Sequence, residues 1–334
     1  MANFLLYFIS LLLVIRITNG DILIGAGLVG IGAVIGGAIH YVMNLKGNVE
    51  NCNPDWVSLN ETKLFYDLNR RLYGQHLASD RIFNAIKGHL DNKTPEKALV
   101  LSFNGMTGTG KNYASRIIVE SIYEKGLSSQ YVKLIIGSHD FKFLKQLELK
   151  KLMLRYWITE IVSKCPRSLF IFDEVEKISP ELINVLRPFL SHFPKVHEVD
   201  YRKTIFIFIG NTGADLINKE TISNRQKRRR REDITIEQMD KVLSKDALNK
   251  VGGFLHSTLL EHRVIDYIVP FLPLEKHNVL KCIEDDLNEK NVRKVTHNLI
   301  GNVLNELLYF PGDTQWFSES GCKKVSSKVD QFIK

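Results

Sequence analysis

The sequence predicts an α/β fold with a parallel sheet, followed by a small, mainly helical C-terminal domain. Three apolar runs, residues 98–103, 168–172 and 204–209, have the length and composition of buried strands. Helical patterns separate these runs, and strands that alternate with helices form parallel sheets. Polar residues follow each run. Ligands of such sheets bind at the carboxyl ends of the strands, so we expect these polar residues to converge on one crevice.

The predicted elements follow one another in a regular order. Apolar residues recur at helical spacing from Glu61 to His89, with a break at residues 73–76. The later elements are a helix over 111–124, a strand over 131–137, a helix over 146–164, a helix from Pro180 through Leu186, and helical patterns over 235–248 and 275–334. We interpret Val269 to Pro273 as a stiff joint between two bodies. The α/β domain is therefore expected over 55–270 and the helical domain over 271–334.

Two apolar segments open the chain. Residues 1–20 have the pattern of a secretory signal peptide, with an apolar run over 4–15 and small residues at Thr18 and Gly20. An uncleaved anchor is the alternative, because no lysine or arginine precedes the run. Residues 21–46 contain an uncharged, glycine-rich run long enough to cross a bilayer of roughly 30 Å. The glycines equally suit a close helix pair or a hairpin in one leaflet, so we predict membrane association and leave spanning open.

The remaining composition fits a globular protein of a secretory compartment. The chain has 334 residues, 25% charged and 44% hydrophobic, with a net charge of +8. Much of that charge lies in the basic block of residues 224–231, so with a secretory signal we expect no nucleic-acid partner. Four cysteines permit disulfides without giving their connectivity: Cys52, Cys165, Cys282 and Cys322. Asn60 and Asn92 each begin an Asn-x-Thr triplet and are candidate glycosylation sites.

The loop after the first predicted strand has the spacing of a phosphate-binding loop. Gly105, Gly110 and Lys111 form the pattern G-x4-G-K, in which backbone N–H groups surround the phosphates and the lysine reaches the outer ones. The following helix directs its N-terminus at the same place. The residues expected to bind nucleotide are Gly105, Met106, Thr107, Gly108, Thr109, Gly110, Lys111 and Asn112. An ordinary lysine at a helix N-terminus is the alternative for Lys111.

Polar residues after the other two strands predict the rest of the site. Asp173 is expected to hold Mg²⁺, and Glu174 to orient and deprotonate an attacking water. Asn211 is expected to position that water or to contact the γ-phosphate. The alternatives are two exposed acids at a strand end and, for Asn211, a turn-forming residue. Together these residues predict hydrolysis of ATP.

These motifs resemble those of the torsins, the AAA+ ATPases of the endoplasmic reticulum lumen and nuclear envelope. Residues 105–112 resemble the torsin phosphate loop, in which asparagine replaces the usual serine or threonine. Residues 171–174 resemble the acidic strand and residues 210–211 the first sensor. Gly321, Cys322 and Lys323 resemble the second sensor, with lysine in place of the common arginine. Tyr73 to Ala78 resembles the segment that cradles adenine in Clp-type relatives, and the resemblance covers nearly the whole chain.

The resemblance implies specific roles for several residues. ATP and Mg²⁺ are the implied cofactors, with Asn112 and Asp173 as the magnesium ligands and Tyr73 and Gly74 beside the adenine. Glu174, Asn211 and Lys323 are the implied catalytic residues. Cys282 and Cys322 are implied to form a redox-responsive pair beside the nucleotide, with a structural bridge or two free thiols as alternatives.

The resemblance also implies a function and partners. Torsins lack their own arginine finger and rely on membrane-bound activators whose luminal domains resemble ATPase folds, so the isolated chain is expected to hydrolyse ATP slowly. The implied function is a chaperone-like remodeller of protein or membrane assemblies, working as a ring or helical oligomer, with monotopic attachment to the membrane surface near residues 22–41. A nucleotide-dependent membrane scaffold with negligible turnover is the alternative, because the amide of Asn112 is a poorer magnesium ligand than a hydroxyl. The basic residues 227–231 could supply a cation across a subunit boundary, bind lipid headgroups, or form a solvated loop.

Overall fold

The computed structural model describes residues 49–141, 146–247, 264–292 and 295–333. The predicted signal peptide, residues 1–20, and the glycine-rich segment, residues 21–46, lie outside the described residues. Within the described ranges, no helix has both the length and the apolar character needed to cross a bilayer. The description below concerns the compact unit that begins at Asn51.

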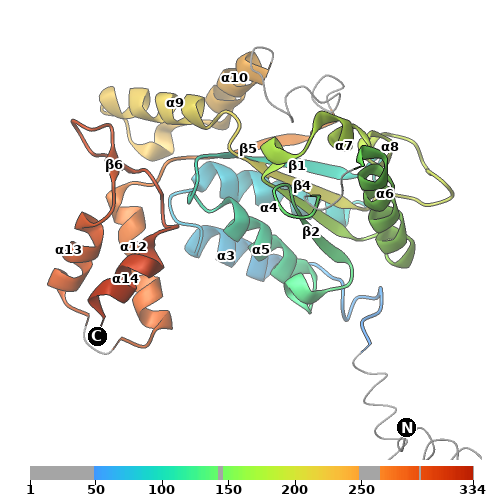
Figure 1. The fold of residues 1–334 in the computed structure, drawn as a ribbon, viewed down its shortest axis with the longest axis horizontal. Helices are drawn as coiled ribbons and strands as arrows, with labels where there is room; N and C mark the ends of the chain where they lie inside the picture. Colours follow the sequence, from blue (N-terminus) through green and yellow to red (C-terminus); the bar gives the residue numbers. More distant parts are fainter. Residues whose placement is uncertain (1–48, 142–145, 248–263, 293–294, 334) are drawn as a thin grey trace, which may run out of the picture. The chain divides into compact units, whose positions relative to one another are not determined.

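Five parallel strands form the central sheet, in the order β2-β3-β4-β1-β5 (Figure 1). Their bounds are β1 Leu99–Gly105, β2 Val132–Ile136, β3 Leu169–Asp173, β4 Ile205–Gly210 and β5 Tyr267–Phe271. Every residue of β1 and β4 is buried, which explains why these strands read as continuous apolar runs: helices cover both of their faces. The predicted parallel sheet is confirmed.

The joint expected at Val269 to Pro273 is wrong, because most of it is a strand. β5 pairs with β1 and extends through Phe271, and only the connection after that residue leaves the sheet. Val269 and Phe271 are fully buried, and the ring of Phe271 lies 5.3 Å from that of Phe103. Pro270 is compatible with this arrangement because β5 is an edge strand. On its open side no neighbouring strand needs a hydrogen bond from the N–H that proline lacks.

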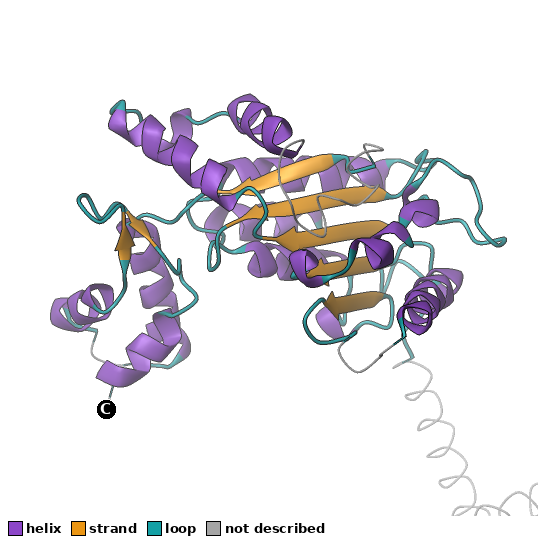
Figure 2. Cartoon of the chain, turned by 45° about the horizontal axis from the view of Figure 1, so that its top comes forward, coloured by secondary structure: helices purple, strands orange, loops and turns teal. Residues whose placement is uncertain are grey.

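Helices cover both faces of the sheet (Figure 2). Leu99, Leu101 and Phe103 pack with α3 Glu61–Arg70, α4 His76–Asp91 and α5 Lys111–Ile122 on one face. Val100 and the phenylalanines of β3 and β4 pack with α6 Leu147–Lys164, α7 Pro180–Asn184 and α8 Arg187–Leu190 on the other. The helix expected from Pro180 through Leu186 ends earlier, at Asn184. A second short helix begins at Arg187, with Pro188 in its first turn, where a missing N–H breaks no helical hydrogen bond. The linking segments include η1 Gly126–Ser128, η2 Val175–Lys177, α9 Ala214–Gln226, η3 Arg231–Asp233 and α10 Ile236–Ala247.

The C-terminal part is mainly helical, as predicted. It comprises α12 Lys276–Glu289, α13 His297–Asn305, the two-residue strands β6 Tyr309–Phe310 and β7 Phe317–Ser318, and α14 Val325–Phe332. These helices enclose an apolar cluster of their own, in which Val279, Ile283 and Val329 are fully buried. A separate core of this kind is what a second folding body requires.

Two disulfides join distant parts of the chain. Cys52, ahead of α3, is bonded to Cys165 at the C-terminal end of α6. Cys282 in α12 is bonded to Cys322, ahead of α14. All cysteines of the described residues are therefore oxidised, and this pairing excludes the two free thiols considered as an alternative for the second pair.

Candidate functional site

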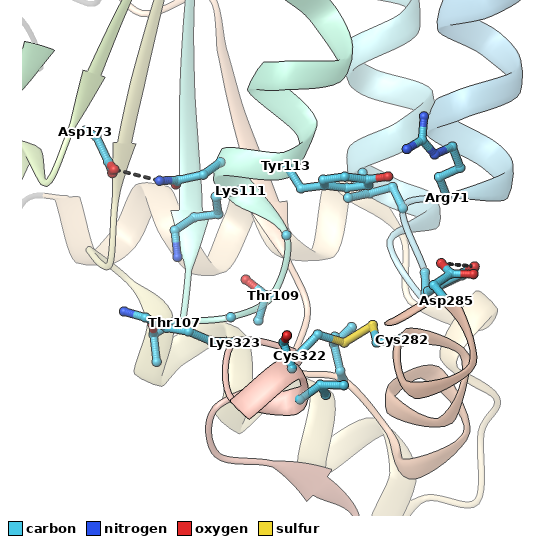
Figure 3. Close-up of a pocket in the computed structure, with 18 of the residues that line it drawn as sticks. Arg71, Thr107, Thr109, Lys111, Tyr113, Asp173, Cys282, Asp285, Cys322 and Lys323 are labelled. Atoms are coloured by element: carbon cyan, nitrogen blue, oxygen red, sulfur yellow. Dashed lines mark hydrogen bonds between the residues drawn. A yellow bond between two sulfur atoms is a disulfide. The ribbon is translucent and has the colours of Figure 1, made fainter. Parts of the chain in front are cut away.

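A cavity of about 760 Å³ opens at the carboxyl ends of β1, β3 and β4 (Figure 3). The predicted site residues that line it are Tyr73, Thr107, Gly108, Thr109, Gly110, Lys111, Asn112, Asp173, Glu174, Asn211, Cys282, Cys322 and Lys323. Gly74, Gly105 and Met106 adjoin this lining without belonging to it. Asn60 and Asn92 lie elsewhere, exposed before α3 and after α4. The structure thus brings residues from six separate segments to one cavity.

Lys111 is the first residue of α5 and is held inside the loop that precedes it. Its Nζ donates hydrogen bonds to the backbone oxygens of Gly105 at 2.6 Å and Met106 at 2.8 Å, and to Oδ1 of Asn211 at 3.1 Å. Burial lowers its pKa to about 8, against the opposing effects of Glu176 and Asp173. The amine is therefore a poorly solvated cation that a phosphate could stabilise strongly.

Asn112 and Asp173 both line the cavity and are hydrogen-bonded to each other. Nδ2 of Asn112 donates to Oδ2 of Asp173 at 2.6 Å, and Oδ1 of Asp173 accepts from the N–H of Glu174 at 2.8 Å. A carboxylate and an amide oxygen are hard ligands of the kind Mg²⁺ takes. No cluster of three or more His, Cys, Asp or Glu suited to a metal occurs among the described residues. The donor set fits Mg²⁺ because that ion commonly takes only one or two protein ligands and completes its shell with water and phosphate oxygens.

Glu174 lines the cavity and has one carboxylate oxygen without a hydrogen-bond partner. Its backbone has φ 53°, in the left-handed region that non-glycine residues seldom adopt, and its Oε2 is buried without a hydrogen-bond partner. Strained backbone of this kind is concentrated at functional sites. A buried acceptor beside the phosphate loop is suited to bind and deprotonate a water.

Glu176 is a site residue that the sequence did not single out. Its Oε1 accepts from Nδ2 of Asn211 at 3.0 Å, while Oδ1 of Asn211 accepts from Lys111. Asn211 is therefore fixed between an acid and the lysine, with both ends of its amide used. The available signal was a third acid in the same turn, two residues after Glu174.

The segment that carries Lys323 touches the phosphate loop directly. The N–H of Cys322 donates to the backbone oxygen of Gly108 at 3.0 Å. A Cβ on Gly108, whose φ is +74°, would lie 1.7 Å from the backbone oxygen of Ser320, and a Cβ on Gly321 would lie 2.1 Å from that of Gly108. Only glycines permit this approach. The Cys282–Cys322 disulfide is thereby placed one residue from Lys323 and against the phosphate loop (Figure 3).

Part of the cavity lining is aromatic or apolar. It includes Leu72, Tyr73, Tyr113 and Leu274, and Figure 3 shows Tyr113 on the side away from Asp173. The hydroxyl of Tyr73 donates to Oδ2 of Asp285 in α12 at 2.7 Å, and burial raises the pKa of this tyrosine. Such walls suit a flat heterocycle better than a phosphate.

Gln75 joins the phosphate loop to the segment that follows β5. Its Nε2 donates to the backbone oxygens of Thr109 at 2.9 Å and Leu272 at 2.8 Å, while its Oε1 accepts from the N–H of Leu272 at 2.8 Å. Gln75 belongs to the segment Tyr73 to Ala78, which resembles the adenine-binding segment of Clp-type relatives. Two of its hydrogen bonds nevertheless go to Leu272, nearly two hundred residues away. Local patterns carry no signal for such a contact.

This arrangement defines the class. A phosphate loop, an acid pair and an asparagine follow three neighbouring parallel strands, and residues 154–251 match the family described as AAA domain (Cdc48 subfamily). The fold and site are those of an AAA-type P-loop ATPase domain, a class that binds nucleotide and whose membership suggests ATP hydrolysis. Residues 48–172 match the Torsin family, and residues 274–332 match the family described as Torsin-1A, C-terminal domain.

Curated relatives agree with these matches. The chain is 38% identical over 283 residues to a Torsin-like protein of Caenorhabditis elegans, covering 84% of this chain and 80% of the relative. It is also 38% identical over 280 residues to human Torsin-3A, covering 83% of this chain and 70% of the relative. The chain therefore belongs to the torsin family, and the predicted resemblance is confirmed.

Solved structures agree on the fold. An ADP complex of Hsp104 from S. cerevisiae superposes with a TM-score of 0.56 at 17% identity, covering 82% of this chain and 47% of that chain. A closed state of Hsp104 with ATPγS and FITC-casein gives a TM-score of 0.57 at 17% identity, covering 82% and 46%. The chain spans about half the length of the Hsp104 chains, and at this identity the likeness concerns the fold alone.

Proposed function

We propose that this torsin is a Mg²⁺-dependent ATPase that remodels protein or membrane assemblies in the endoplasmic reticulum lumen and the perinuclear space. The observation that carries the proposal is the convergence of Lys111, Asp173, Glu174 and Asn211 on one cavity. Phosphates would lie against the N-terminus of α5, and the adenine would lie between Tyr73 and Leu274. Membership of the AAA class supports nucleotide as the ligand.

Each side chain then has a defined task. Lys111 exchanges its backbone oxygen acceptors for the outer phosphates, and Asn211, fixed by Glu176, keeps the amine in place. Glu174 accepts the proton of the attacking water. Asn112 and Asp173 would hold Mg²⁺, which supplies charge neutralisation for the phosphate oxygens when bound. Lys323 brings a second cation to the phosphate side.

An activator would supply an arginine to the phosphate end of the cavity. Its lining cations among the described residues are Lys111, Lys177 and Lys323, whereas Arg71 lies at the opposite end beside Tyr113. An arginine finger contributes roughly 10³ to 10⁵ in rate. We infer that this arginine comes from a membrane-bound partner with an ATPase-like luminal domain, alternating with copies of this chain in a ring or helical oligomer.

The disulfides support the proposed compartment. Cys52–Cys165 and Cys282–Cys322 account for all the cysteines, and disulfides persist in oxidising compartments such as the lumen. Asn60 and Asn92 are both exposed, as glycan acceptors must be. A signal peptide over residues 1–20 and monotopic attachment through residues 21–46 complete the proposal.

ATP turnover with and without a candidate activator domain tests this function. We expect slow turnover alone and a stimulation of several orders of magnitude with the activator. Glu174→Gln should lower the stimulated turnover roughly 10² to 10⁴-fold while ATP binding persists. Glu181→Gln, an exposed acid in α7, is the matched control and should keep full turnover. Fast turnover without activator, or full activity of Glu174→Gln, would contradict the proposal.

A membrane-bound scaffold that uses nucleotide only for assembly is the second candidate. The 2.6 Å hydrogen bond from Asn112 to Asp173 favours it, because the amide nitrogen occupies a carboxylate oxygen that Mg²⁺ would need. If Glu174→Gln replaces the wild-type chain fully in cells, while a Lys111→Met variant does not, assembly rather than hydrolysis is the function.

A further inference from the structure

The basic block contains one residue that differs from the others. Lys227, Arg228, Arg229 and Arg230 are exposed, in agreement with a solvated loop. Arg231 is only 7% exposed and begins η3, so for this residue the solvated alternative is wrong. In a run of consecutive basic residues, no local pattern marks which member turns inward.

Arg231 binds two backbone oxygens that are far apart in sequence. Its Nε donates to the oxygen of Gly74 at 2.6 Å, and its Nη1 donates to the oxygen of Pro273 at 2.7 Å. Its Nη2 is buried without a hydrogen-bond partner. Burial lowers its pKa to about 10, so the group remains charged at neutral pH. Glu275 and Glu232 partly offset this effect electrostatically, but the hydrogen bonds of the guanidinium go to two carbonyl oxygens and to neither acid, a costly arrangement for stability alone.

Each oxygen belongs to a residue adjacent in sequence to a residue that lines the cavity. Gly74 follows Tyr73, and Pro273 precedes Leu274, and these two neighbours line the cavity from opposite chain segments. Gly74 has φ +70°, and a Cβ there would lie 2.7 Å from Oδ1 of Asn278 in α12. The guanidinium therefore joins the segment at Gly74 to the segment at Pro273.

Gln75 also hydrogen-bonds to two segments that are far apart in sequence, but one of its partners differs in kind from those of Arg231. Gln75 links Leu272 to Thr109 of the phosphate loop, whereas no bond of Arg231 reaches that loop. Arg225 adds a bond from the end of α9 to Oε2 of Glu275 at 2.8 Å, just beyond Pro273. The end of α9 and η3 thus hold the connection between β5 and α12 against the segment at Gly74.

We propose that Arg231 is a positioning residue for the nucleobase, which sets the separation of the Tyr73 and Leu274 walls by bridging Gly74 and Pro273. The proposal rests on nucleotide binding at the cavity, as proposed above. A positioning role can be distinguished from a purely structural one, because loss of the bridge would then disturb binding of the base and leave binding of the phosphates intact. Recognition of adenosine and recognition of phosphates should then respond differently to its substitution.

The test compares two probes on the full chain: MgATP, which has a base, and inorganic tripolyphosphate with Mg²⁺, which has none. Arg231→Gln is expected to weaken ATP binding roughly 10-fold or more, the usual effect of losing a charged hydrogen bond, while tripolyphosphate affinity changes less than about twofold. Arg231→Lys keeps the charge with one donor group and should fall between wild type and Arg231→Gln. Arg229→Gln, an exposed residue of the same block, should bind both probes as wild type does.

The outcomes are distinguishable. An equal loss of affinity for both probes would show that Arg231 is a structural residue and would overturn the inference. An unchanged affinity for ATP would also overturn it. If Arg231→Gln does not fold, the ratio of the two affinities in Arg231→Lys decides in the same way. Failure of the wild-type chain to bind MgATP at all would refute the proposed function itself, independently of Arg231.

Discussion

Protonation of Lys111 should be coupled to nucleotide binding. Burial lowers the pKa of this lysine to about 8, so at about pH 8 half of the chains carry a neutral amine. Triphosphate favours the charged form, so binding raises the pKa and the complex takes up a proton. The sign follows directly: affinity is highest where the lysine is already charged and falls as pH rises through its pKa.

The magnitude follows from the same titration. About one tenth of the chains are deprotonated at pH 7 and about nine tenths at pH 9, so the dissociation constant for MgATP should rise about tenfold over this interval. Proton uptake should be about 0.1 per ATP at the lower pH and about 0.9 at the higher. Isothermal titration calorimetry in buffers of different ionisation enthalpy measures the uptake.

A matched control identifies the group responsible. Lys177 also lines the cavity but is exposed, so Lys177→Met should retain the proton uptake. Lys111→Arg, which stays charged over this range, should abolish it. Uptake near zero in the wild-type chain at about pH 8, or uptake that persists in Lys111→Arg, would refute the burial argument.

Three further substitutions probe other parts of the site. Gly108→Ala should lower the free energy of unfolding by roughly 1–3 kcal/mol because of its positive φ and the close backbone oxygen, and urea unfolding that matches wild type would contradict this contact. Asn112→Thr should raise activated turnover, because it releases Asp173 from the amide and supplies a hydroxyl ligand; slower turnover would show that the amide is required. Removing the Cys52–Cys165 bridge by a double serine substitution should cost roughly 2–5 kcal/mol in stability with ATP affinity unchanged, since neither residue lines the cavity, and altered affinity would count against that separation.

The parts that could be predicted from sequence are those with local signals. The runs at 98–103, 168–172 and 204–209 are strands because burial on both faces demands continuous apolar residues. The polar residues after them reach one cavity because parallel strands end at the same edge. The phosphate loop was recognisable from the spacing of Gly105, Gly110 and Lys111 together with the apolar strand before it and the helical pattern after it.

The parts that could not be predicted depend on distant partners. Pro270 and Pro273 suggested a joint, and only pairing with β1 makes the first of them part of an edge strand. Arg231 looks like its exposed neighbours until its carbonyl partners are known, and Gln75 depends on Leu272. Each miss involves a contact that joins residues far apart in the sequence.

The bond between Cys52 and Cys165 determines where mechanical load would enter the molecule. Tension applied to the polypeptide ahead of Cys52 bypasses α3 and acts at the end of α6. From there the chain continues into β3, which ends at Asp173. A pull from the N-terminal side is therefore transmitted covalently toward the strand that carries the acid pair, and reduction of this one bond would redirect the same pull onto the helices of the opposite face.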